Sequence, residues 1–438
     1  MPLIAAMVPK HTTLASWALS RGIVTHGVKL APIPGKGIGL IASTKLSKGD
    51  VLLTLPTPAI ITEETPLVRD VPQLKDVVGT VHGRLAAALL LNSRTPNGDD
   101  DGNGEADLGP WREVWPSRSD FASMPLLWLV EAQQRLLPEC RELLAKQRAK
   151  LDTDWAVYGP ALTEEGVERE EFEYYWLVVN TRVFFWPHAV RWKAGGAGGG
   201  KRRKIKSVNQ DECLALCPVA DYLNHAGSGC AFESNPRECR IVCDRTYEEG
   251  EEVVVSYGPH TNAFLLVEYG FTLKHNPHDT LCLDSVILPG LSEEQEEWLE
   301  AHNYLGGYVL SSSGFCFRTQ VALRADTVAW ANRKNPWREL TIPEQVVQLE
   351  AFIAGEDPDK DFWGSDLIGC EHDVKTMTLD EKVKELKELW DEDTERGGEG
   401  AEVQAREGLW RGAMRLIDMA DDITRTEYAV YRLKEETQ

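Results

Sequence analysis

Short apolar runs separated by turn residues occur in two distant parts of the chain. Residues 38–55 alternate apolar and polar positions around a Ser-Lys-Gly-Asp turn, a pattern that predicts a β-hairpin with its turn at Lys48 and Gly49. Strand-like runs return at residues 241–243 and 253–256, on either side of a Glu-Gly turn, and again at residues 280–288. We therefore predict a sheet assembled from both parts of the chain.

Between these strand regions, apolar residues recur at helical spacing and over helical lengths. The stretches concerned are residues 86–91, 126–130, 141–151 and 172–185. They predict a helical insertion that divides the sheet-forming sequence into two parts. Residues 95–109, within the insertion, are rich in Gly, Asp and Asn and nearly without apolar groups, so we expect a mobile loop there.

After Pro289 the sequence becomes helical and acidic. The predicted helices are residues 292–302, 342–354, 379–390 and 403–431. The last of them has apolar residues at spacings near three and four, which is typical of an amphipathic helix in a bundle. These residues are Leu409, Met414, Leu416, Ile417, Met419 and Ala420. Ser292 and Gln295 form a capping-box pattern, which places a helix start at Ser292.

The composition limits the class of protein. At 438 residues, 42% of them hydrophobic, the chain exceeds one core, and a prior of about 150 residues per domain indicates two or three compact pieces. No apolar run approaches the roughly 20 residues of a membrane span. The apolar residues 1–8 have no basic residue before them, so we expect no secretion signal. Nine cysteines at scattered positions fit a reducing compartment, the cytoplasm or the nucleus.

The charge indicates the kind of partner. The formal net charge is −22, with 69 acidic and 47 basic residues, so we expect the chain to repel nucleic acid and to attract basic protein surfaces. A basic cluster at residues 201–206 follows a Gly-rich stretch at residues 195–200. This pattern predicts a flexible solvated loop over residues 194–208. The alternative is a nuclear localisation signal or a contact with an acidic surface.

Three short motifs carry the candidate chemistry. The first is Gly-Lys-Gly-Ile-Gly at residues 35–39, where missing Cβ atoms allow the backbone to approach a ligand closely. The second is Asp-Tyr-Leu-Asn-His at residues 221–225, whose first, fourth and fifth side chains share one face if the segment is helical. The third is a pair of Tyr-Gly steps at residues 257–258 and 269–270. Each motif alone is more often a plain hairpin, a turn or part of a core, but together they need a common explanation.

These motifs, in this order, resemble the SET-domain methyltransferases, and among them the branch of the Rubisco large-subunit lysine methyltransferase and the actin histidine methyltransferase. The resemblance implies an α+β fold in which small β-sheets are split by a helical insertion and followed by an all-helical C-terminal domain. The implied parts are an N-terminal helix with the first part of the SET domain, the insertion, the second part of the SET domain and a helical substrate-binding domain. Their boundaries are residues 1–62, 63–186, 187–276 and 277–438.

The resemblance also implies roles for single residues, with S-adenosylmethionine as the cofactor. Tyr257 is implied to be the catalytic residue. The implied cofactor-binding residues are Lys36, Gly37, Ile38, Arg182, Asp221, Asn224, His225, Tyr269 and Phe271. The implied substrate channel includes Phe184, Tyr257 and Tyr269. Arg182 lies in an apolar stretch and therefore needs an anionic partner, which is either the cofactor carboxylate, as the resemblance implies, or a structural carboxylate.

The implied reaction is a direct in-line transfer of a methyl group from a sulfonium to a lysine amine. Such a transfer needs no metal, so catalysis is mostly positioning. A lysine amine has a pKa of about 10.4 in water, and an apolar channel lowers that pKa so that the neutral amine is available. The CxxxC pairs that start at Cys213 and Cys239 are spaced more widely than structural zinc usually requires, so we predict no metal site.

Two alternatives to lysine methylation stay open. Histidine methylation is the first, and Phe184 argues against it, because by the resemblance the histidine-methylating relatives carry Asn at this place. The second is a non-catalytic adaptor that binds proteins through its helical part, a hypothesis weakened by the presence of the implied catalytic and cofactor-binding residues. Without the cysteine-rich flank of histone-directed members, and with an acidic C-terminal part, the chain is expected to methylate a basic non-histone protein, such as a ribosomal protein or a translation factor.

Overall fold

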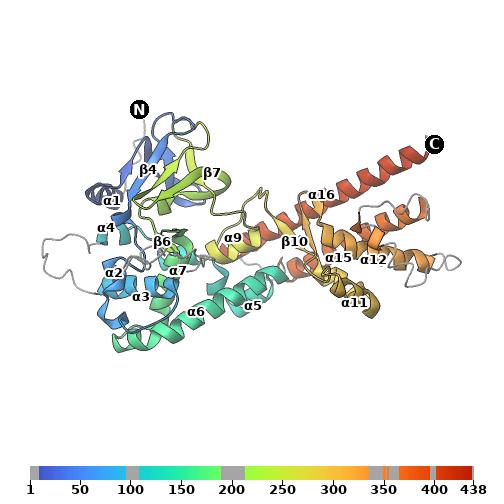
Figure 1. Ribbon diagram of the computed structural model, residues 1–438, viewed down its shortest axis with the longest axis horizontal. Helices are drawn as coiled ribbons and strands as arrows, with labels where there is room; N and C mark the ends of the chain where they lie inside the picture. The colour runs from blue at the N-terminus through green and yellow to red at the C-terminus, as the bar shows by residue number, and fades with distance from the viewer. Residues whose placement is uncertain are drawn as a thin grey trace, which may run out of the picture. The chain divides into compact units, whose positions relative to one another are not determined.

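The computed structural model describes residues 9–94, 108–188, 213–334, 349–351, 353–354, 365–394 and 401–436. The chain forms two compact units, whose elements are coloured along the chain in Figure 1. The first unit is Met1–Ala122 with Leu144–Pro259, and the second is Ser123–Leu143 with His260–Gln438. Outside the described residues lie most of the predicted loop at 95–109, the basic loop at 194–208 and most of the predicted helix at 342–354. The domain boundaries inferred from the sequence stay predictions.

A seven-stranded mixed sheet is the frame of the first unit (Figure 1). Its strands, in the order in which they lie side by side, are β1 (Val24–Thr25), β4 (Val51–Pro56), β8 (Glu238–Val242), β7 (Asn224–Asn235), β9 (Glu252–Val255), β3 (Gly37–Ala42) and β2 (Val28–Ile33). β7 and β9 are parallel, and the other neighbouring strands are antiparallel. The three later strands lie in the middle and are flanked on each side by two early ones, so the prediction of a sheet built from both parts of the chain is confirmed.

The predicted hairpin over residues 38–55 is wrong. β3 pairs with β2 and β9, whereas β4 pairs with β1 and β8, so the two strands are not neighbours in this sheet. The turn itself is present, because Gly49 has a φ of +91° and the Asp50 N–H donates to the Ser47 carbonyl at 3.0 Å. A short apolar run specifies a strand but not its partner, which depends on the register and burial of the whole sheet.

The helices of the first unit belong mostly to the N-terminal segment and the insertion. They are α1 (Pro9–Ser20), α2 (Pro66–Arg69), α3 (Val81–Arg94), α4 (Gly109–Arg112), α6 (Pro138–Glu164, in this unit from residue 144 on) and α7 (Arg169–Arg182), with short 3-10 helices η1 (Thr57–Ala59), η2 (Pro72–Leu74), η3 (Arg118–Phe121) and η6 (Ala220–Tyr222). The helix predicted at residues 172–185 ends at Arg182, and a two-stranded sheet of β5 (Val183–Phe185) and β6 (Leu214–Leu216) follows.

A buried polar network holds the helical insertion together. Asp154 of α6 is 2% exposed and accepts hydrogen bonds from Thr80 Oγ1 at 2.6 Å and from Trp176 Nε1 of α7 at 2.9 Å. α3 carries Gly83 at this point, where a Cβ atom would lie 2.7 Å from the Asp154 carboxylate and 2.6 Å from the Tyr158 ring. Glycine is therefore required here in spite of its poor helix propensity.

The second unit is mostly helical. Its helices are α5 (Val130–Gln134), α9 (Asn262–Tyr269), α10 (Asp284–Ile287), α11 (Glu293–Ala301), α12 (Phe317–Lys334), α15 (Ser365–Thr394) and α16 (Ala401–Glu436), with 3-10 helices η4 (Pro125–Leu127) and η7 (Leu288–Gly290). The capping box at the start of α11 is confirmed, since Ser292 Oγ accepts from the Gln295 N–H at 3.3 Å and Gln295 Oε1 accepts from the Ser292 N–H at 2.8 Å. Helix α16 buries the predicted residues Leu409, Leu416, Ile417 and Ala420, whereas Met419 is 38% exposed.

The strand predicted at residues 280–288 is shorter and belongs to a separate sheet. β10 (Thr280–Cys282) pairs with β11 (Val309–Ser311), which pairs with β12 (Gly314–Phe315), all antiparallel. This small sheet is an addition to the helices expected in the C-terminal part. None of the helices in the described residues is long and apolar enough to cross a membrane.

Candidate active site

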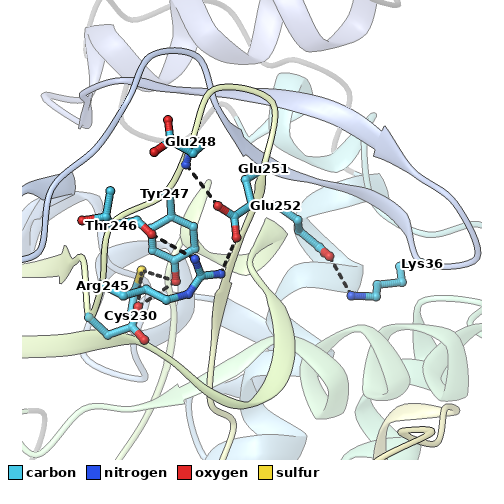
Figure 2. Close-up of polar contacts among 9 residues, drawn as sticks. Lys36, Cys230, Arg245, Thr246, Tyr247, Glu248, Glu251 and Glu252 are labelled. Atoms are coloured by element: carbon cyan, nitrogen blue, oxygen red, sulfur yellow. Dashed lines mark hydrogen bonds and ion pairs between the residues drawn. The ribbon is translucent and has the colours of Figure 1, made fainter.

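The glycine-rich motif forms the tight turn between β2 and β3. Gly35 and Gly37 have φ values of +72° and +78°, a region that side chains with a Cβ rarely adopt, and the Lys36 N–H donates to the Ile33 carbonyl at 3.0 Å. Nothing lies within 4 Å of the place that a Cβ atom would take at either glycine. The turn therefore presents its backbone to open space. The Lys36 side chain forms an ion pair of 2.7 Å with Glu252 (Figure 2).

The second motif does not form the single helical face expected from its spacing. The 3-10 helix η6 ends at Tyr222, and Asn224 is already the first residue of β7. Successive side chains of a strand point to opposite faces, so Asn224 and His225 reach different partners. Asn224 bonds to Glu252, His225 to the backbone of Tyr257, and Asp221 to Arg182. The prediction of a shared face is wrong because the helix stops too early.

His225 and Tyr257 are joined by a hydrogen bond between side chain and backbone. His225 is 3% exposed, and its Nδ1 accepts from the Tyr257 N–H at 3.0 Å. A backbone N–H can only donate, so Nδ1 carries no proton in this arrangement. The Tyr257 hydroxyl donates in turn to the Leu223 carbonyl at 2.8 Å. Both ends of Tyr257 are thus fixed by the segment that contains the Asn-His motif.

Arg182 finds its anionic partner in Asp221. Arg182 Nη1 lies 2.8 Å from Asp221 Oδ2 and donates also to the Asp221 carbonyl at 3.2 Å. The Asp221 side chain is fully buried and accepts a further hydrogen bond of 3.0 Å from Trp111 Nε1. Burial raises the pKa of Asp221, and the nearby Arg182 opposes that rise. The structural carboxylate that the sequence left open as a partner for Arg182 is therefore present.

Phe184 lies on β5 and stacks on an aromatic residue of the main sheet. Its ring centroid is 5.3 Å from that of Phe232 on β7, with an angle of 24° between the ring planes. Offset stacking of this kind fixes the orientation of a ring. The neighbouring Phe185 is 49% exposed. Phe184 is thus held by a ring contact, whereas the ring of its neighbour is largely exposed.

Tyr269 and Phe271 belong to the second unit. Tyr269 is the last residue of α9, and Gly270 follows it as a left-handed helix cap with a φ of +79°. The Tyr269 and Phe271 rings lie 6.2 Å apart, and burial raises the pKa of Tyr269 to about 12. The second Tyr-Gly step therefore has a local cause of its own, the end of a helix. The first step, at Tyr257, follows the end of β9 instead.

A comparison with protein-family models matches residues 37–258 to the SET domain. This segment is half of the chain and contains the end of the glycine-rich motif from Gly37 on, the Asn-His motif and Tyr257. The chain belongs to the SET-domain family. The resemblance inferred from the motifs is confirmed.

Relatives and solved structures of SET-domain proteins agree with this membership. The ribosomal lysine N-methyltransferase set11 of Schizosaccharomyces pombe is 25% identical over 328 residues, which cover 73% of this chain and 76% of that protein. An actin-histidine N-methyltransferase of Drosophila melanogaster is 24% identical over 289 residues, covering 62% and 50%. The structure of Rubisco LSMT bound to sinefungin and monomethyllysine aligns with a TM-score of 0.56 at 15% identity, over 97% of this chain and 93% of that one. The predicted α+β SET fold with C-terminal helices is confirmed.

One set of residues of the SET domain was missed by sequence reasoning. Tyr247, in the acidic turn before β9, is buried, and its hydroxyl donates to Asp244 Oδ1 at 2.7 Å. The Cys230 thiol lies 3.5 Å from the same hydroxyl, and the Arg245 guanidinium lies 4.0 Å from the centre of the Tyr247 ring (Figure 2). Burial raises the pKa of Tyr247. These contacts anchor the turn that leads into Glu252, and an aromatic residue within a charged turn was the signal in the sequence.

Buried cysteines of the SET domain lie beside one another in combinations that differ from the CxxxC pairs of the sequence. The neighbouring Cys239 thiol raises the pKa of Cys217 well above its ordinary value, and burial adds to the rise. Burial, and after it the neighbouring Cys230, raises the pKa of the Cys243 thiol to about 12. Over the described ranges, no three His, Cys, Asp or Glu side chains come together as a metal-binding group.

Proposed function

We propose that this SET-domain protein is an S-adenosylmethionine-dependent N-methyltransferase that acts on lysine side chains of a non-histone protein. The observation that carries the proposal is the fixed position of Tyr257, whose backbone is held by His225 and whose hydroxyl is held by Leu223. A reaction that depends on positioning needs such a fixed group.

The residues present fit the cofactor. The turn at Gly35 and Gly37 exposes backbone without side chains, which suits close approach of a ligand. Asn224 supplies an amide oxygen that can accept from an ammonium group. When bound, S-adenosylmethionine supplies the methyl group, which passes from the sulfonium sulfur to the lone pair of a neutral lysine amine while the carbon–sulfur bond breaks. We assign cofactor binding to the residues implied by the family: Lys36, Gly37, Ile38, Arg182, Asp221, Asn224, His225, Tyr269 and Phe271.

The Tyr257 hydroxyl has a defined role as a hydrogen-bond donor. Its one proton is donated to the Leu223 carbonyl at 2.8 Å, so toward any other group this oxygen acts as an acceptor. An oxygen acceptor can orient a positively polarised methyl group through weak C–H···O contacts. We therefore assign to Tyr257 the catalytic role, with His225 and Leu223 holding it in place.

Phe184 supports lysine as the acceptor. An aromatic ring cannot hold an imidazole by a hydrogen bond, but it makes the surroundings of an amine apolar, which lowers the pKa of that amine. Its stacking on Phe232 keeps the ring in one orientation. Histidine methylation, the activity in the name of the Drosophila relative, is the weaker alternative.

The charge of the chain supports a basic protein substrate. With a net charge of −22, the protein attracts basic surfaces and gains in association rate from that attraction. The fission yeast relative is named a ribosomal lysine N-methyltransferase. Ribosomal proteins are a class of basic proteins, so they fit this attraction. We propose a ribosomal protein or a translation factor as the substrate and the cytoplasm, with or without the nucleus, as the location.

The test is a transfer reaction with isotope-labelled S-adenosylmethionine and a methylation-depleted cell extract, followed by mass spectrometry of the labelled residues. We expect label on lysine, and a loss of about a hundredfold or more in the Tyr257→Phe variant, because an ordered site depends on that hydroxyl. Tyr304→Phe, a change of the same kind in the second unit, is the matched control and should keep its activity.

Three outcomes would contradict parts of the proposal. Label on histidine would favour the alternative acceptor. Binding of S-adenosylmethionine without any transfer would favour the non-catalytic adaptor. Labelling of acidic proteins but no ribosomal protein or translation factor would contradict the proposed substrate class alone.

A further inference from the structure

Glu252 connects two motifs that lie far apart in the sequence. Its Oε2 atom forms an ion pair of 2.7 Å with Lys36 Nζ from the glycine-rich turn, and its Oε1 atom accepts from Asn224 Nδ2 at 2.8 Å. Figure 2 shows the contact with Lys36 beside the anchored turn of Tyr247. One carboxylate thus contacts both segments to which the proposed function assigns the cofactor.

The bond to Glu252 decides which way the Asn224 amide faces. An ionised carboxylate can only accept hydrogen bonds, so Asn224 must turn its NH2 group toward Glu252. The amide oxygen Oδ1 then points away from Glu252. An asparagine in a neutral environment has no such preference, because its two ends are nearly equal in shape.

The surroundings restrict the amide from a second side. β3 passes beside it with Gly39, where a Cβ atom would lie 2.8 Å from Asn224 Nδ2 and 3.6 Å from Glu252 Oε1. The backbone of Asn224 is itself paired with Val254 in the parallel β7–β9 ladder. The backbone of Asn224 is therefore fixed, and Gly39 leaves little space beside the amide. The remaining freedom is the exchange of the amide oxygen and NH2 positions, which Glu252 prevents.

A purely structural role explains these contacts poorly. The side chains of Lys36 and Glu252 are 43% and 20% exposed, and exposed ion pairs contribute little to stability. The Lys45–Glu248 pair is an equally short contact, 2.7 Å, on the neighbouring turn, with both side chains about two-thirds exposed and no amide attached. Glu252 differs from Glu248 in holding a polar group whose orientation matters.

We propose that Glu252 is a positioning residue for the cofactor: it fixes the Asn224 amide so that Oδ1 is offered as the acceptor for the ammonium group of the amino-acid end of S-adenosylmethionine. Lys36 balances the charge of Glu252 and ties the glycine-rich turn to the same carboxylate. This inference rests on the proposed function, because it concerns the same cofactor.

The experiment compares two ligands by isothermal titration calorimetry. S-adenosylmethionine contains the ammonium group, whereas 5′-methylthioadenosine lacks the whole amino-acid end. We expect Glu252→Gln to weaken binding of S-adenosylmethionine by about tenfold and binding of 5′-methylthioadenosine by less than about twofold; tenfold corresponds to about 1.4 kcal/mol. The glutamine can donate as well as accept, so the amide loses its preferred orientation. Glu248→Gln is the matched control and should change neither affinity.

A donor–acceptor exchange tests the orientation itself. In the double variant Asn224→Asp with Glu252→Gln, the new glutamine donates to the new aspartate, and a carboxylate oxygen takes the place of Oδ1. We expect this double variant to recover most of the preference for S-adenosylmethionine over 5′-methylthioadenosine, even if Glu252→Gln alone folds poorly. Lys45→Met, which removes the comparable ion pair with Glu248, should leave the ratio of the two affinities near that of the wild type.

The failure of this inference differs from the failure of the proposed function. If the unchanged protein binds S-adenosylmethionine but Glu252→Gln weakens both ligands equally, or neither, Glu252 is not a positioning residue for the ammonium group. A double variant that folds, as checked by its thermal transition, and does not recover the preference overturns it too. If the unchanged protein binds neither ligand and transfers no methyl group, the proposed function fails as well.

Discussion

The backbone N–H of Tyr257 donates to Nδ1 of His225 at 3.0 Å, so the histidine of the Asn-His motif holds the backbone of the proposed catalytic tyrosine. The two residues are 32 positions apart: His225 lies near the start of β7, and Tyr257 follows the end of β9. Because this contact uses the backbone of Tyr257, it leaves the hydroxyl to be oriented separately by Leu223.

Replacing His225 by alanine should therefore destabilise the protein and lower its activity. The change removes a hydrogen bond from a side chain that is 3% exposed and leaves the Tyr257 N–H without this acceptor, at a cost of about 1 to 3 kcal/mol. Urea unfolding measures the loss, and His26→Ala, at an exposed position, is the control that should stay within about 0.5 kcal/mol of wild type. Equal stability of the two variants would contradict the assigned role of His225.

Replacing Phe184 by asparagine should shift the acceptor from lysine toward histidine. The asparagine can hold an imidazole by a hydrogen bond, whereas the loss of stacking on Phe232 costs about 1 kcal/mol beyond the buried area and makes the site less apolar. Mass spectrometry of peptides that contain both residues measures the ratio of products. Phe185→Asn, at the exposed neighbour, is the control and should leave the ratio unchanged. No rise in histidine methylation would mean that Phe184 does not select the acceptor.

Glu139, in the second unit, should make the stability fall as the pH rises above the ordinary range of glutamate. Burial raises the pKa of Glu139, while the Lys382 charge lowers it and the Glu385 charge raises it again. The folded state then holds a proton that the unfolded state releases, so the free energy of unfolding decreases between the unfolded and the folded pKa values. Glu139→Gln should flatten this dependence, as measured by urea unfolding from pH 4 to pH 8. Glu131→Gln, at an exposed glutamate of α5, serves as the control, and identical slopes in both variants would contradict the prediction.

Gly83→Ala should destabilise the protein although alanine favours helices by about 1 kcal/mol over glycine. The added Cβ atom would lie 2.6 Å from the Tyr158 ring and 2.7 Å from Asp154, which forces the buried network of the insertion apart. Overpacking of this kind typically costs about 1 to 3 kcal/mol. Thermal unfolding checks the direction. Gly290→Ala, where nothing lies within 4 Å of the new atom, is the matched control, and a stabilised Gly83→Ala variant would show that the helices can move apart freely.

The sequence predicted the elements of the fold better than their partners. Helical periodicity located α3, α6, α7 and α16, and the strands of the SET domain were found on both sides of the insertion. The pairing of β3 with β9 instead of β4 depends on contacts between distant segments, which local alternation does not record. The chain likewise gave no sign that η6 would end before Asn224 and separate three side chains that an unbroken helix would have brought to one face.

In the site, the motifs predicted the residues, and the structure supplied the connections between them. Arg182 needs an anionic partner in any apolar surrounding. Only the fold shows that this partner is Asp221, which also accepts a hydrogen bond from Trp111. Glu252 was overlooked because it ends a run of acidic residues that has the composition of an exposed turn. Its neighbours Glu248 and Glu251 do belong to such a turn, so composition alone cannot separate the three.

The arrangement of early strands around late ones also has a consequence for folding during synthesis. Lys36 and Glu252 are 216 residues apart, and β3 cannot find its neighbour β9 until that later strand has been synthesised. Contacts between residues so far apart in the sequence slow folding. During synthesis, the edges of β3 and β4 that pair with the later strands have no partner yet. The nascent chain is therefore expected to need chaperones until β9 has left the ribosome, and the site cannot bind its cofactor before that point.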